Sequence, residues 1–330
     1  MMEDPITRTL KPFDFAHLFT EVPELHRFDL NLQTYSFEPP IDSSDIQPSH
    51  WKQMVEVIRD NYHAFDGFVV LHGTDTMAFT ASALSFMLRG LNKPVILTGS
   101  QLPIGMLRTD GKENLISAIQ IAGMYRDDRP RVPEVAVYFG ANLFRGNRTH
   151  KYSTEDFEAI HSPNLPSLAE VGIHIQFSTN ILPYVKDAEL VVQTEVEHRV
   201  AVLKLFPGIA PAVVESVCAI PDLRGLIIET FGSGNATTSD WFINALNFAR
   251  KKGVRIVNVT QCNRGFVEQG RYATSSGFQE MGIIPAVDMT LEAALTKMMV
   301  LLKQELDETD FARRMVSSLA GELTSYSTLV

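Results

Sequence analysis

The sequence predicts an α/β protein with a mostly parallel sheet in a larger N-terminal domain and a smaller C-terminal α/β domain. Short apolar runs alternate with helical patterns along the chain, which is typical of βαβ units and parallel sheets. The length of 330 residues favours two domains. The alternation loosens near residues 182–195. We therefore expect domains at 1–185 and 200–330, joined by a linker region at 186–199.

Hydrophobic spacing predicts the individual elements. Residues 28–34 alternate apolar and polar side chains, as a half-buried strand does. A helix is expected where apolar residues recur at helical spacing, at Trp51, Met54, Val55, Ile58 and Tyr62. Asp110 followed by Glu113 is typical of a capping box that opens a helix. The remaining pattern predicts strands at 67–72, 94–98, 135–138, 200–206, 225–229 and 255–260, and helices at 76–91, 110–124, 239–252 and 290–306.

Composition excludes several classes of partner. The formal net charge of −10 argues against nucleic acid or an anionic membrane surface, since both require a basic face. Cys218 and Cys262 are the two cysteines and lie far apart, so a disulfide framework is not expected. No run approaches the roughly 18 apolar residues of a membrane span. The first residues lack a secretory signal pattern. These observations predict a cytoplasmic protein.

Polar groups gather where two neighbouring strands are predicted to end. The run ending at Leu71 gives way to His72-Gly-Thr-Asp75, and the run ending at Leu97 gives way to Thr98-Gly-Ser-Gln101. In open α/β sheets, ligands bind beyond the carboxyl ends of the strands. The sequence therefore predicts a pocket for a small polar molecule. Motifs for dinucleotides, nucleoside triphosphates and zinc are absent.

Each candidate residue also has a structural interpretation. Thr74 and Asp75 fit a helix N-cap, and they also fit a hydroxyl at a pocket floor beside a carboxylate that holds an ammonium group. Lys151 follows a predicted strand and could activate a threonine hydroxyl as a neutral amine, although most lysines are solvated. Ser43 and Ser44, between two aspartates, suit a turn as well as a ligand contact.

Several segments closely resemble those of the cytosolic, type I L-asparaginases. They are Leu71-His-Gly-Thr-Asp-Thr-Met77, Leu97-Thr-Gly-Ser-Gln101 and Arg145-Gly-Asn-Arg-Thr149 with Lys151. The same is true of Asp42-Ser-Ser-Asp45, Phe231-Gly-Ser-Gly-Asn235 and Val259-Thr-Gln-Cys262. The resemblance covers practically the whole chain. It implies hydrolysis of L-asparagine to L-aspartate and ammonia without a metal or organic cofactor. It also implies a homo-oligomer, either a dimer or a tetramer.

The resemblance also implies roles for particular residues. Thr74, Asp75 and Lys151 match the family's second catalytic threonine, its aspartate and its lysine. Asp42, Ser43, Ser44 and Ser100 match positions around the bound substrate, with Ser43 at the α-carboxylate. Backbone N–H groups near Thr74 and Ser100 would stabilise an oxyanion. Asn235 matches a residue that family members donate across the dimer interface.

One departure concerns the first catalytic threonine, which the family carries in a Thr-Gly-Gly-Thr-Ile-Gly segment. These 330 residues contain no such segment. We expect the nucleophile to lie upstream of Met1 and these residues by themselves to be poorly active. The family's allosteric asparagine site is not expected, since Glu229 stands near the position where relatives carry an arginine. Two alternatives remain, a non-catalytic homologue that binds aspartate or asparagine, and the amidase half of an amidotransferase.

Overall fold

The computed structural model describes residues 2–3, 10–11, 22–182, 189–270 and 273–325. The chain divides into two compact units, residues 1–194 and 195–330. This division falls inside the segment 186–199 that the sequence pattern marks as the connection, and the domain boundaries stay a prediction. No helix among the described residues is both long enough and apolar enough to cross a membrane.

The N-terminal unit is built on a mixed sheet whose parallel part carries the predicted strand ends. In the described residues the strand order is β13-β12-β9-β8-β5-β3. The pairs β3–β5 and β5–β8 are parallel, whereas β8–β9, β9–β12 and β12–β13 are antiparallel. The six strands are β3 Phe68–Leu71, β5 Val95–Thr98, β8 Val135–Phe139, β9 Asn142–Arg145, β12 Ala169–Val171 and β13 Ile175–Phe177.

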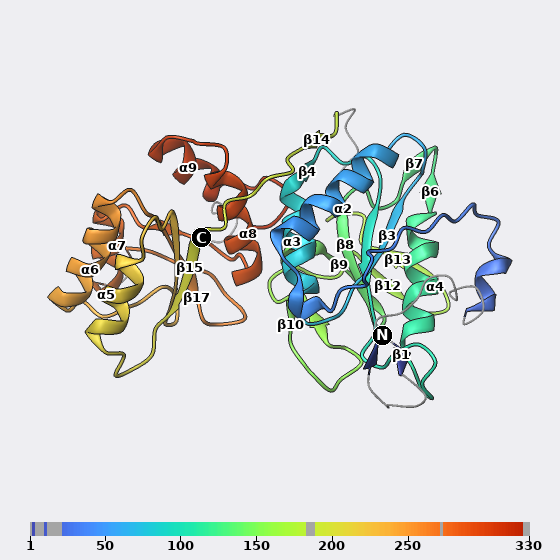
Figure 1. Ribbon diagram of the computed structural model, residues 1–330, viewed down its shortest axis with the longest axis horizontal. Helices are drawn as coiled ribbons and strands as arrows, with labels where there is room; N and C mark the ends of the chain where they lie inside the picture. Colours follow the sequence, from blue (N-terminus) through green and yellow to red (C-terminus); the bar gives the residue numbers. More distant parts are fainter. Residues whose placement is uncertain (1, 4–9, 12–21, 183–188, 271–272, 326–330) are drawn as a thin grey trace. The chain divides into compact units, whose positions relative to one another are not determined.

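Helices cover both faces of this sheet. Figure 1 shows α2 and α3 on one side of the strands and α4 on the other. Alternate strand residues such as Ile96 and Ala136 pack against Ala118 and Ile121 of α4. The residues predicted to form the apolar face of α2 are all buried, which confirms the helical pattern there. The helices are α2 Pro48–Asn61, α3 Met77–Met87 and α4 Gly111–Ala122.

Short two-stranded pairs and 3-10 turns complete the N-terminal unit. Each of these pairs is antiparallel. The strands are β1 Met2–Glu3 with β2 Leu10–Lys11, β4 Leu88–Arg89 with β14 Val191–Val192, β6 Tyr125–Arg126 with β7 Arg129–Pro130, and β10 His150–Lys151 with β11 Ile160–His161. The 3-10 turns are η2 Pro23–Arg27, η3 Ser43–Asp45 and η4 Gly146–Arg148.

Three local predictions are wrong in this unit. Residues 28–34 form no strand, because no neighbouring strand pairs with them in the described part of the chain; instead Phe28 and Leu32 pack on a small apolar cluster. Helix α3 ends at Met87 rather than near Leu91, because Leu88 turns into strand β4. The predicted capping box at α4 is absent, because the Asp110 side chain bonds the preceding loop instead.

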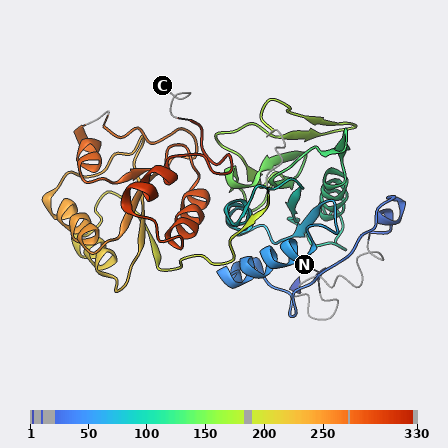
Figure 2. The same ribbon diagram turned by 90° about the horizontal axis from the view of Figure 1, so that it is seen from above.

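The C-terminal unit is a separate α/β layer structure. Its described sheet is fully parallel, in the order β15-β16-β17-β18. Leu226 and Ile228 face a core with α5, α6 and α7, whereas Ile227 faces a core with α8 and α9. Figure 2 shows these helix groups on opposite sides of the strands. The elements are β15 Val200–Lys204, α5 Pro211–Ala219, β16 Gly225–Thr230, α6 Asp240–Lys251, β17 Arg255–Thr260, α7 Ala273–Glu280, β18 Ile284–Pro285, α8 Leu291–Leu302 and α9 Glu308–Met315.

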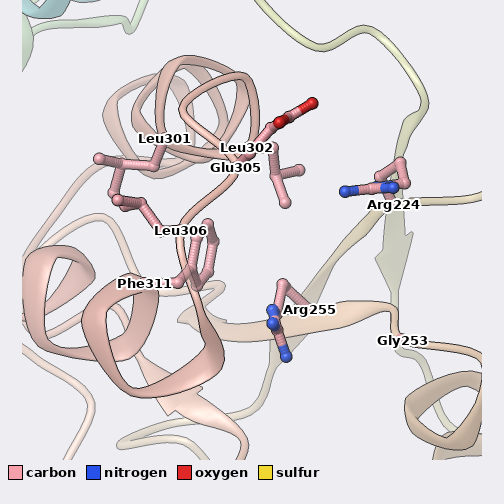
Figure 3. A pocket seen from close by; sticks show the side chains of 8 residues that line it. All are labelled: Arg224, Gly253, Arg255, Leu301, Leu302, Glu305, Leu306 and Phe311. Atoms are coloured by element: carbon pink, nitrogen blue, oxygen red, sulfur yellow. The ribbon is translucent and has the colours of Figure 1, made fainter.

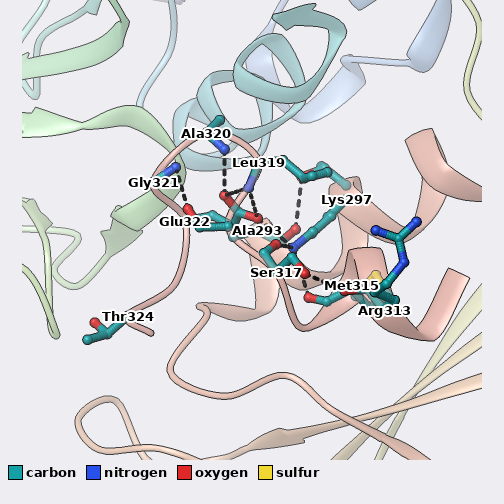
Figure 4. Close-up of polar contacts among 12 residues, drawn as sticks. Ala293, Lys297, Arg313, Met315, Ser317, Leu319, Ala320, Gly321, Glu322 and Thr324 are labelled. Atoms are coloured by element: carbon teal, nitrogen blue, oxygen red, sulfur yellow. Dashed lines mark hydrogen bonds and ion pairs between the residues drawn. The ribbon is translucent and has the colours of Figure 1, made fainter. Parts of the chain in front are cut away.

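A buried ion pair fastens the segment after α9 to α8. Lys297 and Glu322 have fully buried side chains, and Lys297 Nζ lies 2.5 Å from Glu322 Oε1. The ammonium also donates to the carbonyls of Met315 and Ser317, at 2.8 and 2.7 Å. The carboxylate accepts the backbone N–H groups of Leu319 and Ala320 (Figure 4). Burial lowers the pKa of Lys297 even though Glu322 faces it.

Candidate active site

Thr74, Asp75 and Lys151 meet in the N-terminal unit. Lys151 Nζ donates to Thr74 Oγ1 at 2.8 Å and to Asp75 Oδ1 at 2.5 Å. Thr74 is buried, with 8% of its surface exposed, whereas the Asp75 side chain is 64% exposed. The Lys151 side chain is 17% exposed. A buried hydroxyl therefore lies beside a lysine–aspartate pair whose aspartate is exposed to solvent.

Packing around a tight turn places Lys151 at the end of β3. The chain leaves β9 and forms the turn η4, where Asn147, Arg148 and Thr149 are buried. The Thr149 hydroxyl donates to the carbonyl of Gly146 at 2.7 Å, which closes the turn. Lys151 then pairs with Ile160 in the β10–β11 ladder. The lysine therefore approaches Thr74 from a largely buried segment.

A chain of hydrogen bonds supports the loop before Thr74. Trp51 Nε1 donates to Thr80 Oγ1 at 3.0 Å, and Thr80 Oγ1 lies 2.9 Å from His72 Nε2. His72 Nδ1 lies 2.6 Å from the carbonyl oxygen of Gly73, which can only accept. The proton is thus on Nδ1, and Thr80 donates to Nε2. Burial lowers the pKa of His72, so the neutral imidazole is favoured and the residue acts as part of the core.

The predicted ligand-contact residues of the 42–45 turn lie against the same loop. Ser43 is buried, and its carbonyl accepts a hydrogen bond from the Thr76 hydroxyl at 2.6 Å. A Cβ on Gly73 would come within 2.8 Å of Ser43 Cβ, so the close approach requires glycine there. Asp42 accepts from the backbone and hydroxyl of Ser44. The Ser44 backbone bond is the main reason that the pKa of Asp42 is lowered.

The second predicted strand end contributes a residue that the sequence pattern did not single out. Ser100 is half-buried, and it lies next to Gly111 at the start of α4. Its neighbour Gln101 accepts the hydrogen bond of the Thr74 hydroxyl at 3.1 Å. Gln101 belongs to the Thr-Gly-Ser-Gln segment, but the residue types alone did not indicate that Gln101, rather than Ser100, would contact Thr74.

Asn235 lies in the C-terminal unit. It closes a tight turn after β16, where its backbone N–H donates to the carbonyl of Phe231 at 2.8 Å and its carbonyl accepts from Phe231 N at 2.9 Å. Its predicted contribution to a partner's site stays a prediction. Among the described residues, no group of three or more His, Cys, Asp or Glu side chains is placed to hold a metal ion.

A small pocket in the C-terminal unit contains none of the predicted site residues. It lies between Arg224, Arg255 and an apolar wall that includes Leu302 and Phe311 (Figure 3). Its space of about 40 Å³ holds a few water molecules, which is too little for an amino acid. Arg255 is also paired with Glu308, at 3.2 Å. This pocket therefore does not compete with the Thr74 cluster as a substrate site.

Comparison with known proteins decides the family. The family model described as "Asparaginase, N-terminal" matches residues 1–183, and the one described as "Glutaminase/Asparaginase C-terminal domain" matches residues 199–315. The chain belongs to the asparaginase family. L-asparaginase 1 of Escherichia coli K12 is 43% identical over 305 residues, which are 92% of this chain and 88% of that protein.

Further relatives agree with this assignment. L-asparaginase I of Vibrio cholerae has a similar crystal structure, with a TM-score of 0.85 and 40% identity over 94% of this chain and 92% of that one. The thermostable L-asparaginase of Thermococcus kodakarensis has a TM-score of 0.86 and 30% identity over the same shares of the two chains. The α/β class and the asparaginase resemblance expected from the sequence are both confirmed. The roles of individual site residues stay predictions.

Proposed function

We propose that this protein hydrolyses the side-chain amide of L-asparagine, giving L-aspartate and ammonia. The observation that carries the proposal is the contact of Lys151 Nζ with both the Thr74 hydroxyl and the Asp75 carboxylate. A threonine acts as a nucleophile or orients water only when a neighbouring base takes its proton. The asparaginase family and its 43% identical relative support this reaction over the non-catalytic alternative.

In this proposal, Asp75 and Ser43 bind the substrate, whereas Thr74 and Lys151 take part in the reaction. The exposed Asp75 carboxylate can hold the α-ammonium of an amino acid. We assign the α-carboxylate to Ser43, which lies against the loop that carries Thr74. A threonine oxygen attacks the amide carbon, and the C–N bond breaks as ammonia leaves with a proton. Water then hydrolyses the resulting ester. Lys151, as a neutral amine, accepts the proton that passes through Thr74 and returns it.

In the family mechanism, the first threonine must lie beside Thr74, Asp75 and Lys151. Strand β3 lies at the edge of the described sheet, so its outer backbone groups can pair with a further parallel strand. A strand there would end next to Thr74, since carboxyl ends of parallel strands meet at the same edge of a sheet. We propose that the nucleophile is presented from this position, and that Asn235 of a second subunit completes the site in a homo-oligomer. A cytoplasmic location also remains part of the proposal.

Ammonia release from L-asparagine tests the function. We would compare the 330-residue protein with a version that carries a Thr-Gly-Gly-Thr-Ile-Gly strand before Met1. The extended version is expected to be the more active. In it, Lys151→Met should lower kcat by about 10²–10⁴-fold, the range typical of a lost acid–base group. Lys204→Met is the matched control, since that lysine is 65% exposed.

Three results would count against the proposal. Equal rates for Lys151→Met and the parent would remove Lys151 from the mechanism. Binding of aspartate without turnover in either version would favour the non-catalytic homologue, which predicts a rise in Tm with ligand and no ammonia. Ammonia release that requires a partner protein and a tRNA-linked substrate would favour the amidotransferase alternative.

A further inference from the structure

Gln101 shares the hydroxyl of Thr74 with Lys151. Thr74 Oγ1 donates to Gln101 Oε1 at 3.1 Å and accepts from Lys151 Nζ at 2.8 Å. A hydroxyl has one proton to donate and two lone pairs to accept with. The proton of Thr74 therefore points to Gln101, and one lone pair remains for a ligand. Gln101 thus sets the direction in which the threonine oxygen can react.

The other end of the Gln101 amide is buried without a hydrogen-bond partner. Its Nε2 is one of few such side-chain atoms in the described part of the chain. Buried amide groups in folded proteins are nearly always hydrogen-bonded, and an exception calls for a partner that the protein itself does not supply. Because Nε2 and Oε1 belong to the same amide, this free donor lies next to Thr74. An oxygen of a bound ligand would satisfy it.

The backbone of Gln101 is held by a partly buried network of hydrogen bonds. The Asp110 carboxylate accepts the N–H groups of Gln101 and Leu102, both at 3.0 Å. Asn114 Nδ2 bridges Asp110 Oδ2 at 3.1 Å and the carbonyl of Gly99 at 2.9 Å. Asp110 therefore fixes the loop after β5 rather than the end of α4. A donor held in this way is prepared for a ligand in advance, which lowers the cost of binding.

We propose that Gln101 binds the substrate directly. Its carbonyl orients the Thr74 hydroxyl, and its amide N–H donates to an oxygen of the side-chain amide or carboxylate that lies against Thr74. This inference rests on the proposed function, because it takes the ligand to be an amino acid with such an oxygen. It adds a substrate-contacting residue at the end of β5 to the three that converge from β3 and β10.

Binding of L-aspartate, the reaction product, tests the inference without any need for turnover. Titration calorimetry would compare the parent with Gln101→Met, which removes both the donor and the acceptor, and with Gln101→Glu, which keeps the shape and the acceptor. Gln101→Met is expected to weaken aspartate binding about tenfold or more, the usual loss for a hydrogen bond to a charged group. Gln53→Met is the control, since Gln53 donates to the Tyr35 hydroxyl in an exposed position, away from Thr74.

The pH dependence separates substrate contact from a structural role. Gln101→Glu places a carboxylate against an anionic ligand, so its affinity for aspartate should be lowest near neutral pH and should recover in mild acid, as the new carboxyl gains a proton to donate. A residue that only supports the fold would lower Tm in both variants and leave the pH profile of binding like that of the parent. In the strand-extended protein, the same variants should lower kcat in the same order in which they lower the affinity for aspartate.

Each outcome has a definite meaning. Aspartate binding and kcat of Gln101→Met within twofold of the parent would overturn the inference and leave the proposed function standing. Variants with a lowered Tm and the parent's pH profile would overturn it as well. Failure of the parent to bind aspartate or release ammonia in either version would overturn the proposed function, and the inference would fall with it.

Discussion

Removing one partner of the buried Lys297–Glu322 pair should strongly destabilise the C-terminal unit. Glu322→Gln keeps the size of the side chain but leaves the Lys297 ammonium buried opposite an amide. Breaking a buried pair in this way typically costs about 3–5 kcal/mol. Both side chains are fully buried, so solvent does not screen the loss. We expect a decrease of this size in the free energy of unfolding.

The double variant Lys297→Met/Glu322→Leu gives the sharper result. Apolar replacements of buried ion pairs are often neutral or stabilising. Here the pair also binds backbone groups, two carbonyls at Met315 and Ser317 and two N–H groups at 319 and 320. Each buried group left without a partner costs about 1–3 kcal/mol. The double variant should therefore remain clearly less stable than the parent.

Urea unfolding followed by tryptophan fluorescence measures this effect. The chain has two tryptophans, and Trp51→Phe leaves Trp241 of the C-terminal unit as the reporter. Asp310→Asn is the control, since its ion pair with Arg313 is exposed, and its unfolding midpoint should stay close to that of the parent. A double variant as stable as the parent would refute the argument that the backbone contacts of this pair matter.

Three further predictions concern other contacts. Arg199 hydrogen bonds lower the pKa of Glu197 from 4.5 to about 2, so the stability it contributes is present above about pH 4.5 and is lost as the pH falls towards 2. In acid unfolding curves, Glu197→Gln should lose about 1–2 kcal/mol less stability than the parent between pH 4.5 and 2; the value is kept small because Arg199 is half exposed and solvent screens the pair. Identical acid unfolding curves for Glu197→Gln and the parent would contradict this prediction. Gly73→Ala should destabilise the protein by about 1–3 kcal/mol in thermal unfolding by overpacking against Ser43, whereas the control Gly172→Ala has open space and should not. Asp110→Ala should speed hydrogen exchange at the loop amides of residues 101 and 102, and unchanged exchange there would show that Asp110 does not hold the loop.

The sequence alone determined the fold class, the family and the two strand ends at which the candidate site lies. These features are encoded locally, because a buried strand needs a run of apolar residues and the chain must become polar where the strand meets solvent. The same reasoning located β3, β5, β16 and β17 close to their observed bounds. It failed at residues 28–34, because an alternating pattern becomes a strand only where a partner strand is present.

Only the tertiary structure decided which side chains meet. Lys151 lies 77 residues from Thr74 in the chain, and the packing of a buried turn brings the two within 2.8 Å. Asp110 has the local signature of a helix cap, yet its carboxylate bonds the loop at Gln101. Hydrophobic periodicity records which face of an element is buried, but it carries no information on which distant polar groups will share a hydrogen bond. That choice depends on how the layers pack.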